Sequence, residues 1–357
     1  MKKLILMALA IAAMAACTKS NVEFDQPGEI AFQPVTEMAT KATFAGTAYP
    51  QDSTFNVWAW WGDVLKTDNP DYSKFNSAKC YIDEQEFTRR DYVSWGGKTP
   101  YYWPTTGSLV FAGYSPAVDG DKKNTFHYYL TAKGNLGDNG YVPAYTFTAT
   151  DYKQSTNIKE TTDLMWFDVT SSSYDKTTAA PGVNVTFKHA LSWLTFRFTL
   201  KDAWTPQNWK IKSVKLTNIF TVADFTAVKN GNTAWSGWEV PLEFVVCSNS
   251  DHQVGYVQNE YNANADDSSV LEDERNGVVV IPQSVTNKKL VIEFEQLTPA
   301  GDWLKQDIML DLNAVGNAWQ TGKHYIYTIT FDAAEILIAP TVKDWTTESQ
   351  SVAIPVQ

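Results

Sequence analysis

Residues Val183 to Leu200 read VNVTFKHALSWLTFRFTL, and this stretch decides the fold. Apolar and polar residues alternate from Val183 to Phe187, which is the period of a half-buried β-strand. The alternation resumes at Leu194, but its phase has moved by one residue after Trp193. A shift of one residue turns every side chain to the other face of a sheet. The stretch is therefore predicted to contain a bulge or bend that carries the chain between two sheets.

Short strand-like segments of the same kind recur along the chain, and no long segment has the period of a helix. Upstream they lie at Ile30–Phe32, Phe55–Trp61, Leu109–Pro116 and Asp163–Phe167. Downstream they lie at Val214–Ile219, Val240–Val246, Gly277–Pro282, Leu290–Phe294, Ile308–Leu312 and Tyr325–Phe331. Regularly spaced short strands are typical of antiparallel sandwiches. The fold class that we predict is all-β, with tandem antiparallel β-sandwich domains.

The domain organisation follows from length and composition. A chain of 357 residues is too long for one small sandwich and suits two domains of ordinary size. Thr170 to Thr178 is rich in Ser and Thr, and the following Ala179 to Gly182 breaks any regular element. We therefore expect a tether and an N-terminal sandwich over residues 17–181, and a C-terminal sandwich over residues 182–357.

The first sixteen residues have the pattern of a secretion signal. Lys2 and Lys3 precede the apolar run Leu4 to Ala16, which is too short to span a membrane as a helix. Small residues lead up to Cys17, so the segment resembles a bacterial lipoprotein signal, in which that cysteine becomes the lipidated first residue. Two or three acyl chains give stable anchoring, whereas one chain does not. We expect a mature protein tethered to the outer membrane through Cys17.

Charge and cysteine content narrow the function. Without Lys2 and Lys3, the mature chain has 27 basic against 40 acidic residues, a net charge of about −13, which opposes binding to nucleic acid. Only Cys80 and Cys247 remain after Cys17, far apart and outside any metal-binding spacing. We interpret both as buried small apolar residues in preference to a disulfide.

No pattern of residues points to catalysis. The four histidines are His127, His189, His252 and His324, and none lies within ligand spacing of another His or of a Cys. We expect His189 and His324 to be core or surface residues. No nucleotide, zinc-protease or serine-hydrolase motif is present, and the acidic residues between Asp266 and Glu274 lack the spacing of a calcium loop. The sequence predicts a protein that is not an enzyme and needs no metal or cofactor.

An ordered set of short motifs resembles the fimbrillin family, the lipoprotein precursors of protease-assembled (type V) surface pili. The N-terminal half carries Val57–Ala59, Tyr102–Pro104 and Phe111–Pro116. The second half carries Val185–Ser192, Val280–Gln283, Gly322–Tyr327 and Val342–Trp345. The motifs span nearly the whole mature chain and follow the lipoprotein-like signal.

The resemblance implies two transthyretin-like sandwiches, export as a lipoprotein, removal of an N-terminal strand by a trypsin-like protease, and assembly with other fimbrial subunits by strand exchange. The family is usually cut after an Arg, yet this chain has none between Cys17 and Arg89. Lys41 stands where that Arg is expected. The chain is therefore either a stalk or tip subunit cut at Lys41, or an uncut anchor that stays lipidated.

The two ends of the chain fit the roles of a removed strand and a donor. Ile30 to Phe32 lies ahead of Lys41 and would leave with the cleaved segment. In the C-terminal tail, Val352, Ile354 and Val356 alternate with Ala353 and Pro355, which is the pattern of a donor strand. We expect a structural or adhesive subunit located in a fimbrium on the outer membrane, whose adhesive form would bind a host protein or glycan receptor.

A second function class competes with this one. The tryptophan-rich segments Trp58–Trp61 and Trp235–Trp238 could stack on sugar rings in a stand-alone glycan-binding surface lipoprotein. The same tryptophans sit in strand-like segments, where packing in a core is the simpler role, and we favour that role.

Overall fold

The computed structural model describes residues 28–36, 49, 53–63, 75–91, 94–117, 146–153, 163–168, 173–177, 182–200, 209–228, 233–239, 241–247, 252–253, 255–256, 278–312, 317–331, 336–344 and 352–353. Within these ranges the regular elements are β-strands, and no α-helix occurs. The described residues contain no helix that is long and apolar enough to cross a membrane. The predicted all-β fold class is confirmed.

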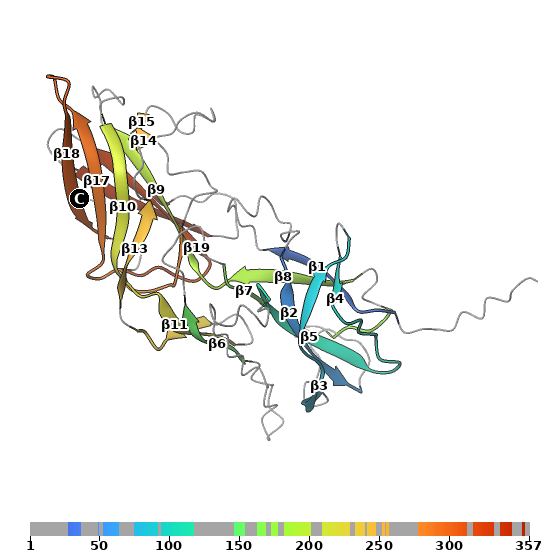
Figure 1. Cartoon of the computed structure of the whole chain (residues 1–357). Helices are drawn as coiled ribbons and strands as arrows, with labels where there is room; N and C mark the ends of the chain where they lie inside the picture. The colour runs from blue at the N-terminus through green and yellow to red at the C-terminus, as the bar shows by residue number, and fades with distance from the viewer. Residues whose placement is uncertain are drawn as a thin grey trace, which may run out of the picture.

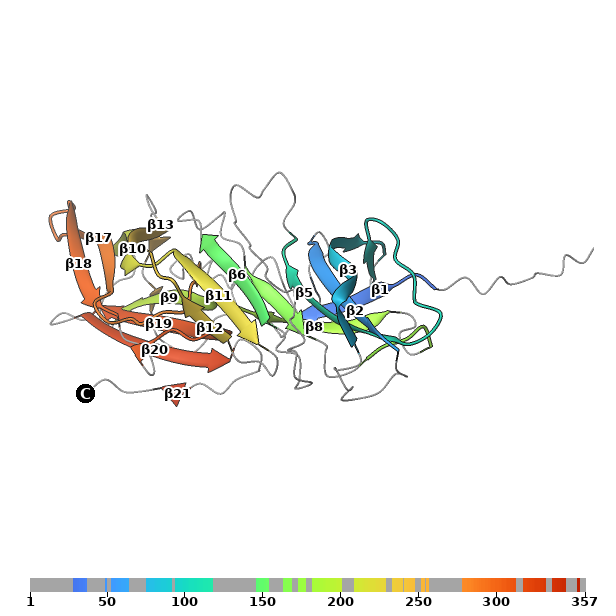
Figure 2. The same cartoon turned by 90° about the horizontal axis from the view of Figure 1, so that it is seen from below.

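The N-terminal lobe is a closed barrel (Figures 1 and 2). Its strands, in order around the barrel, are β1 (Ala31–Thr36), β4 (Trp95–Gly97), β3 (Phe75–Arg89), β2 (Phe55–Gly62), β5 (Ser108–Ser115), β7 (Met165–Asp168) and β8 (Val183–His189). Apolar residues of all seven strands or their flanks fill the interior, which we call the barrel core.

The C-terminal lobe is a sandwich of two sheets. One sheet has the order β13 (Leu242–Cys247), β10 (Trp209–Ile219), β17 (Lys289–Leu297) and β18 (Trp303–Asp311), with β14 (His252–Gln253) also on β10. The other has the order β15 (Gly255–Tyr256), β9 (Ser192–Leu200), β19 (Lys323–Phe331), β20 (Ile336–Asp344) and β21 (Val352–Ala353), with β16 (Val278–Val280) also on β9. The sandwich core between them takes residues from both sheets, including Phe196, Leu216, Phe294 and Tyr327.

A third core joins the two lobes. The small sheet of β6 (Thr146–Lys153), β11 (Val222–Val228) and β12 (Thr233–Ser236) pairs a strand from the first half of the chain with two from the second. The junction core contains Trp58 and Trp166 from the barrel, Phe225 from this sheet, and Trp193 from the sandwich. Continuous apolar packing therefore connects the lobes.

The stretch from Val183 to Leu200 does carry the chain between sheets, as its phase shift predicted. β8 pairs with β1 and β7 in the barrel, and β9 pairs with β19 in the sandwich. The chain changes sheet at Ala190 and Leu191, which are both fully buried in the junction core. Trp193 then faces the junction core while Leu194 faces the sandwich core, which accounts for the shifted phase.

The expected boundary at residue 182 is not where the lobes meet. Val183, Val185 and Phe187 of β8 belong to the barrel core, so the barrel continues to His189. The antiparallel pairing that the sequence predicted has exceptions, because β1 pairs with β8, and β9 with β15 and β19, in parallel. These pairs bring together strands that are distant in sequence, and local patterns carry no information about direction.

Candidate assembly site

The site begins with the position that β1 occupies in the barrel. β1 lies between β4 and β8, pairing antiparallel with Trp95 and Gly96 and parallel with Val183 to Phe187. A strand with a neighbour on each side closes the barrel, so its loss would leave two unpaired edges. The sequence-predicted nucleus Ile30–Phe32 thus contributes to a real strand, which begins at Ala31.

Phe32 is the side chain that ties β1 to the barrel core. It is fully buried, and its ring meets Phe87 and Phe111 edge-on at centroid distances of 4.9 and 5.1 Å. Its ring also meets Phe55 edge-on at 5.8 Å. Such edge-to-face pairs add to the free energy of burying a large ring. Val35 on the same strand is 41% exposed, so the two faces of β1 differ sharply.

The residues just before β1 are also fixed. The backbone N–H of Ile30 donates to the carbonyl oxygen of Tyr101 at 2.7 Å, and that of Trp103 donates to the carbonyl oxygen of Gly28 at 2.9 Å. Arg90 forms a bidentate ion pair with Glu29, with Nη1 to Oε2 at 2.6 Å. Bidentate Arg–carboxylate pairs add geometric specificity to the attraction. The chain is therefore held from residue 28 to the end of β1.

Tyr49 anchors the chain again before β2. It is nearly fully buried, stacks on Phe187 at 4.8 Å, and shares a hydrogen bond of 2.6 Å with the hydroxyl of Ser115. Its own hydroxyl donates to the carbonyl oxygen of Thr54 at 3.0 Å. Burial raises the pKa of the Tyr49 phenol well above its usual value. Residues 37–48, which contain Lys41, therefore connect two buried anchors.

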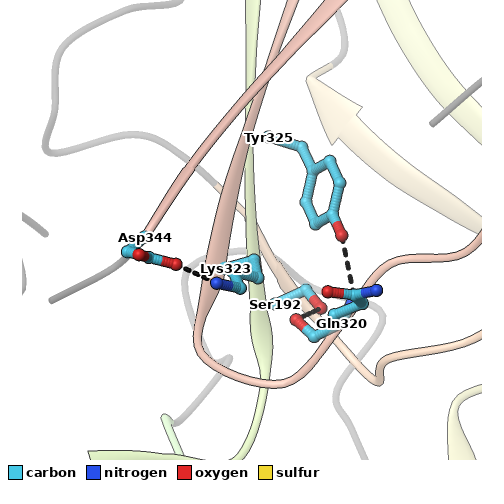
Figure 3. A network of polar contacts seen from close by, with 5 residues as sticks. All are labelled: Ser192, Gln320, Lys323, Tyr325 and Asp344. Atoms are coloured by element: carbon cyan, nitrogen blue, oxygen red, sulfur yellow. Dashed lines mark hydrogen bonds and ion pairs between the residues drawn. The ribbon is translucent and has the colours of Figure 1, made fainter. Parts of the chain in front are cut away.

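The C-terminal tail follows Asp344, the last residue of β20. Lys323 at the start of β19 forms an ion pair with Asp344, the last residue of β20 (Figure 3). Nearby, the hydroxyl of Ser192 donates to the carbonyl oxygen of Gln320 at 2.7 Å, and the backbone N–H of Gln320 donates to the hydroxyl of Tyr325 at 2.9 Å. These contacts hold the end of β20 and the start of β19 in place.

The predicted donor segment lies partly within the described residues. β21 pairs antiparallel with β20 through Val352 opposite Val342 and Ala353 opposite Thr341. These are the two pairs that join it to β20 in the part of the tail that the structure describes. Ile354 and Val356 lie outside the described residues, as do Cys17 and Lys41, so the structure does not test those assignments.

The buried histidines serve the core, as predicted. Nδ1 of His189 lies 2.6 Å from Oδ2 of Asp163, and both side chains are almost completely buried. His324 stacks on Trp193 at 3.6 Å, and its Nε2 lies 3.0 Å from Oγ1 of Thr195. The described residues hold no group of three His, Cys, Asp or Glu side chains placed to bind a metal. His127 and the acidic residues between Asp266 and Glu274 lie outside them, as does the side chain of His252.

The cysteines lie in different lobes, because Cys80 is on β3 of the barrel and Cys247 ends β13 of the sandwich. Their side chains are outside the described part of the chain, so their burial stays a prediction.

The tryptophans of the competing glycan-binding hypothesis are mostly structural. Trp58 and Trp60 are buried in the junction core. Trp235 packs against the same core and donates its Nε1 hydrogen to the carbonyl oxygen of Ala190 at 3.1 Å. Trp238 alone of these four is exposed, at 39%. Packing therefore accounts for most of the aromatic clusters.

The comparisons with known proteins agree with this architecture. The model of the fimbrillin-like family matches residues 40–345. The chain belongs to the fimbrillin-like family. No curated protein matches this fimbrillin-like chain at a significant level.

Solved structures resemble the fimbrillin-like chain over most of its length. One is a fimbrial protein from Bacteroides vulgatus, with 15% identity and a TM-score of 0.58, and the match covers 89% of this chain and 99% of that one. Another is a protein from Bacteroides uniformis assigned to cell adhesion, with 19% identity and a TM-score of 0.53, and the match again covers 89% and 99%. At these identities the likeness shows the fold.

The motifs that suggested the fimbrillin-like family have structural roles at the site. Tyr101 and Trp103 hold the backbone ahead of β1. In Phe111–Pro116, Gly113 lies so close to the carbonyl oxygen of Asn56 that a Cβ there would collide with it. The first contacts hold the backbone ahead of β1, and the second requires a glycine where β5 packs against β2.

Sequence reasoning missed two residues of the site. Tyr49 stands in a segment rich in turn residues and gave no periodic signal, so its burial was not foreseen. The ion pair between Glu29 and Arg90 joins residues 61 positions apart, which no local pattern reveals.

Proposed function

We propose that this chain is a non-enzymatic subunit of a bacterial surface fimbria, exported as a lipoprotein through Cys17 and assembled by strand exchange. In the proposal, cleavage after Lys41 frees β1, and the tail of another subunit occupies the vacated position. The observation that carries the proposal is that β1 closes the barrel while its far end continues into residues 37–48, which contain Lys41.

Removing β1 and the residue before it would expose part of the barrel core. Ile30 and Phe32 are both fully buried, and each such side chain contributes about 1.5 to 3 kcal/mol when buried. The edges of β4 and β8 would also lose their hydrogen-bond partner. An open position of this kind binds an extended segment whose apolar residues alternate, because that segment restores both the ladder and the core.

The tail 345–357 suits the donor role. Val352, Ile354 and Val356 alternate, and three buried aliphatic side chains contribute on the order of 5 to 9 kcal/mol before ordering costs. Within the described residues, two pairs join β21 to β20, and strand exchange would have to break them. Fully extended from Asp344, the thirteen residues of the tail span at most roughly 45 Å. Pro355 lacks an N–H, so it must face a side without a ladder partner.

The test is to trim the purified chain at Lys41 and measure its size. Trimmed protein is expected to polymerise, whereas untrimmed protein and Lys41→Gln treated with the same protease stay monomeric or dimeric. Ile354→Asp is expected to prevent polymerisation, because a buried charge without a partner is costly. Gln357→Asp, which lies beyond the alternating residues, serves as the matched control.

The outcomes separate the alternatives. Polymers that form equally well with Ile354→Asp would rule out the tail as the donor. Trimmed wild type that stays small would favour an anchor or tip role over a stalk role. Lys41→Gln that is still cut and still polymerises would place the cleavage elsewhere.

The alternative glycan-binding function loses most of its basis, because Trp58 and Trp60 are buried. An adhesive role within the fimbria remains part of the proposal, with a host protein or glycan as the receptor. Isothermal titration with host and plant polysaccharides tests it. Binding that Trp238→Ala abolishes would restore the glycan-binding hypothesis.

A further inference from the structure

β18 is the outer edge of the sandwich. Its nine residues, Trp303 to Asp311, pair along their whole length with β17 and with no other described strand. Figures 1 and 2 both place β18 at the end of the molecule away from the barrel. Nearly every residue of β18 is exposed. A long exposed edge can pair with another strand, so proteins usually protect such edges.

This edge is apolar as well as exposed. Of the seven large apolar side chains that are prominently exposed in the described residues, three lie on β18. They are Trp303 at 37%, Leu304 at 50% and Met309 at 62%. Edge strands that are protected from pairing usually carry charged side chains at such positions. The charged residues nearer its centre, Lys305 and Asp307, have opposite signs.

The order of residues along β18 is complementary to itself. Two copies related by a two-fold axis normal to the sheet run antiparallel, and residues directly opposite each other share a face. With the axis at Gln306, Lys305 of each copy lies opposite Asp307 of the other. In the same register Leu304 lies opposite Ile308, and Trp303 lies opposite Met309. From Trp303 to Met309, every directly opposed pair is then either oppositely charged, apolar or the two glutamines, and Leu310 and Asp311 extend past the β18 of the other copy.

Slipping the register is unfavourable in both directions. Faces are preserved only if the axis moves by a whole residue along the strand. Moving it to Lys305 places two lysines opposite each other, and moving it to Asp307 places two aspartates opposite each other. Like charges directly opposite are destabilising. The charges therefore disfavour the two neighbouring registers, and a further step to Ile308 loses the apolar pairs because it places Asp307 opposite Met309 and Gln306 opposite Leu310.

A second copy would also place a positive charge beside Asp307. Within one chain, Asp307 is the cross-strand partner of Glu293 on β17, whose Oε1 lies 3.7 Å from Nζ of Lys215. Lys305 is highly exposed, and its Nζ lies 4.0 Å from Oε1 of Glu295, at the distance limit of an ion pair. Pairing would give each Asp307 a lysine on its open side.

We propose that two copies of this chain pair through β18 across a two-fold axis at Gln306, joining their outer sheets into one continuous sheet. The contact is closed, because each β18 edge is used once, so it gives a dimer and no filament by itself. It does not depend on strand exchange at β1. If the proposed fimbrial assembly also holds, the same contact joins subunits of two filaments side by side.

The experiment is sedimentation equilibrium of the untrimmed chain from Ser20 onward, which retains every described residue. Wild type is expected to show a monomer–dimer equilibrium. Lys305→Asp and Asp307→Lys are each expected to weaken dimerisation by about tenfold or more, because each places like charges across the axis. The double variant Lys305→Asp/Asp307→Lys restores opposite charges and is expected to recover dimerisation.

Asp307→Lys is the decisive single change. It places a lysine opposite Glu293 within one chain, so a purely structural effect would not destabilise the monomer and would leave dimerisation unchanged. Leu242→Asp is the matched control, because Leu242 is 46% exposed on β13 at the opposite edge of the same sheet. Thermal unfolding confirms that each variant is folded.

A cross-link tests the register directly. Residues opposite each other in antiparallel strands have Cα atoms about 4.5 to 5.5 Å apart, which a disulfide can span. Gln306→Cys is therefore expected to form a covalent dimer on mild oxidation, in excess of any formed by the parent chain, while Gln296→Cys on β17 is not.

A monomer at all concentrations, or equal dimerisation by all charge variants, would overturn the proposal. A dimer that Leu242→Asp abolishes would place the contact elsewhere. Ile354→Asp is expected to leave the β18 dimer intact, because residue 354 is not part of β18. The charge variants of β18 therefore test the dimer, and Ile354→Asp tests strand exchange independently.

Discussion

Phe32→Ala is the sharpest test of how β1 is held. The ring is fully buried and makes edge-on contacts with three other phenylalanines, so truncation removes its burial and leaves a cavity in the barrel core. Buried Phe→Ala changes cost about 3 to 5 kcal/mol. The neighbouring strands belong to a closed barrel, which limits how far they can collapse onto the cavity. We therefore expect a loss of about 4 kcal/mol in the free energy that holds β1 in place.

Hydrogen exchange of the β1 amides measures this free energy locally, without requiring the two lobes to unfold together. In Phe32→Ala, exchange over residues 31–36 is expected to accelerate by about 10² to 10³-fold. Val35→Ala is the control on the same strand, because Val35 is partly exposed, and it is expected to accelerate exchange by less than about tenfold. Equal acceleration by the two variants would refute the idea that Phe32 anchors the strand.

Two further predictions concern Lys288 and Cys17. Lys288 is buried, its Nζ donates to the carbonyl oxygen of Asn218 at 2.7 Å, and burial lowers its pKa to about 8 from the ordinary value near 10.5. The folded chain then binds fewer protons here than the unfolded chain, so this residue makes stability rise between pH 8 and pH 10.5, by up to about 3 kcal/mol. Urea denaturation of wild type and Lys288→Met across this window should show the rise in wild type only; parallel curves would contradict it. Cys17→Ala should leave both lobes folded but release the chain from membranes, and a variant that stays in the membrane fraction after a carbonate wash would refute lipid anchoring.

Besides the β-strands, the sequence predicted a change of sheet and the protein family. The phase shift after Trp193 indicated that the chain changes sheet, and the structure places that change at Ala190 and Leu191. The motif around Tyr102 predicted the family, and its neighbours Tyr101 and Trp103 hold the backbone ahead of β1. Local patterns succeed here because alternation and turn residues act within a few positions along the chain.

The lobe boundary and the strand directions could not be predicted from local patterns, because contacts between distant residues decide them. The Ser/Thr-rich stretch before Gly182 has the composition of a linker, yet β8 follows it directly and returns to the barrel beside β1. Closing that barrel depends on contacts between residues about 150 positions apart, such as Phe32 with Val183. The junction core likewise uses residues from both halves of the chain, so it has no signature in either half.

The amino-acid sequence by itself determined that this protein is built from β-strands and that its motifs are those of the fimbrillin-like family, because both depend on short-range order along the chain. Only the tertiary structure decided that β1 closes a barrel around Phe32, that Trp58 and Trp60 are core residues, and that β18 is left as an open edge. Whether a strand is central or at an edge depends on which distant segments pair with it. That is a property of the folded chain, and the residues of one strand do not reveal it.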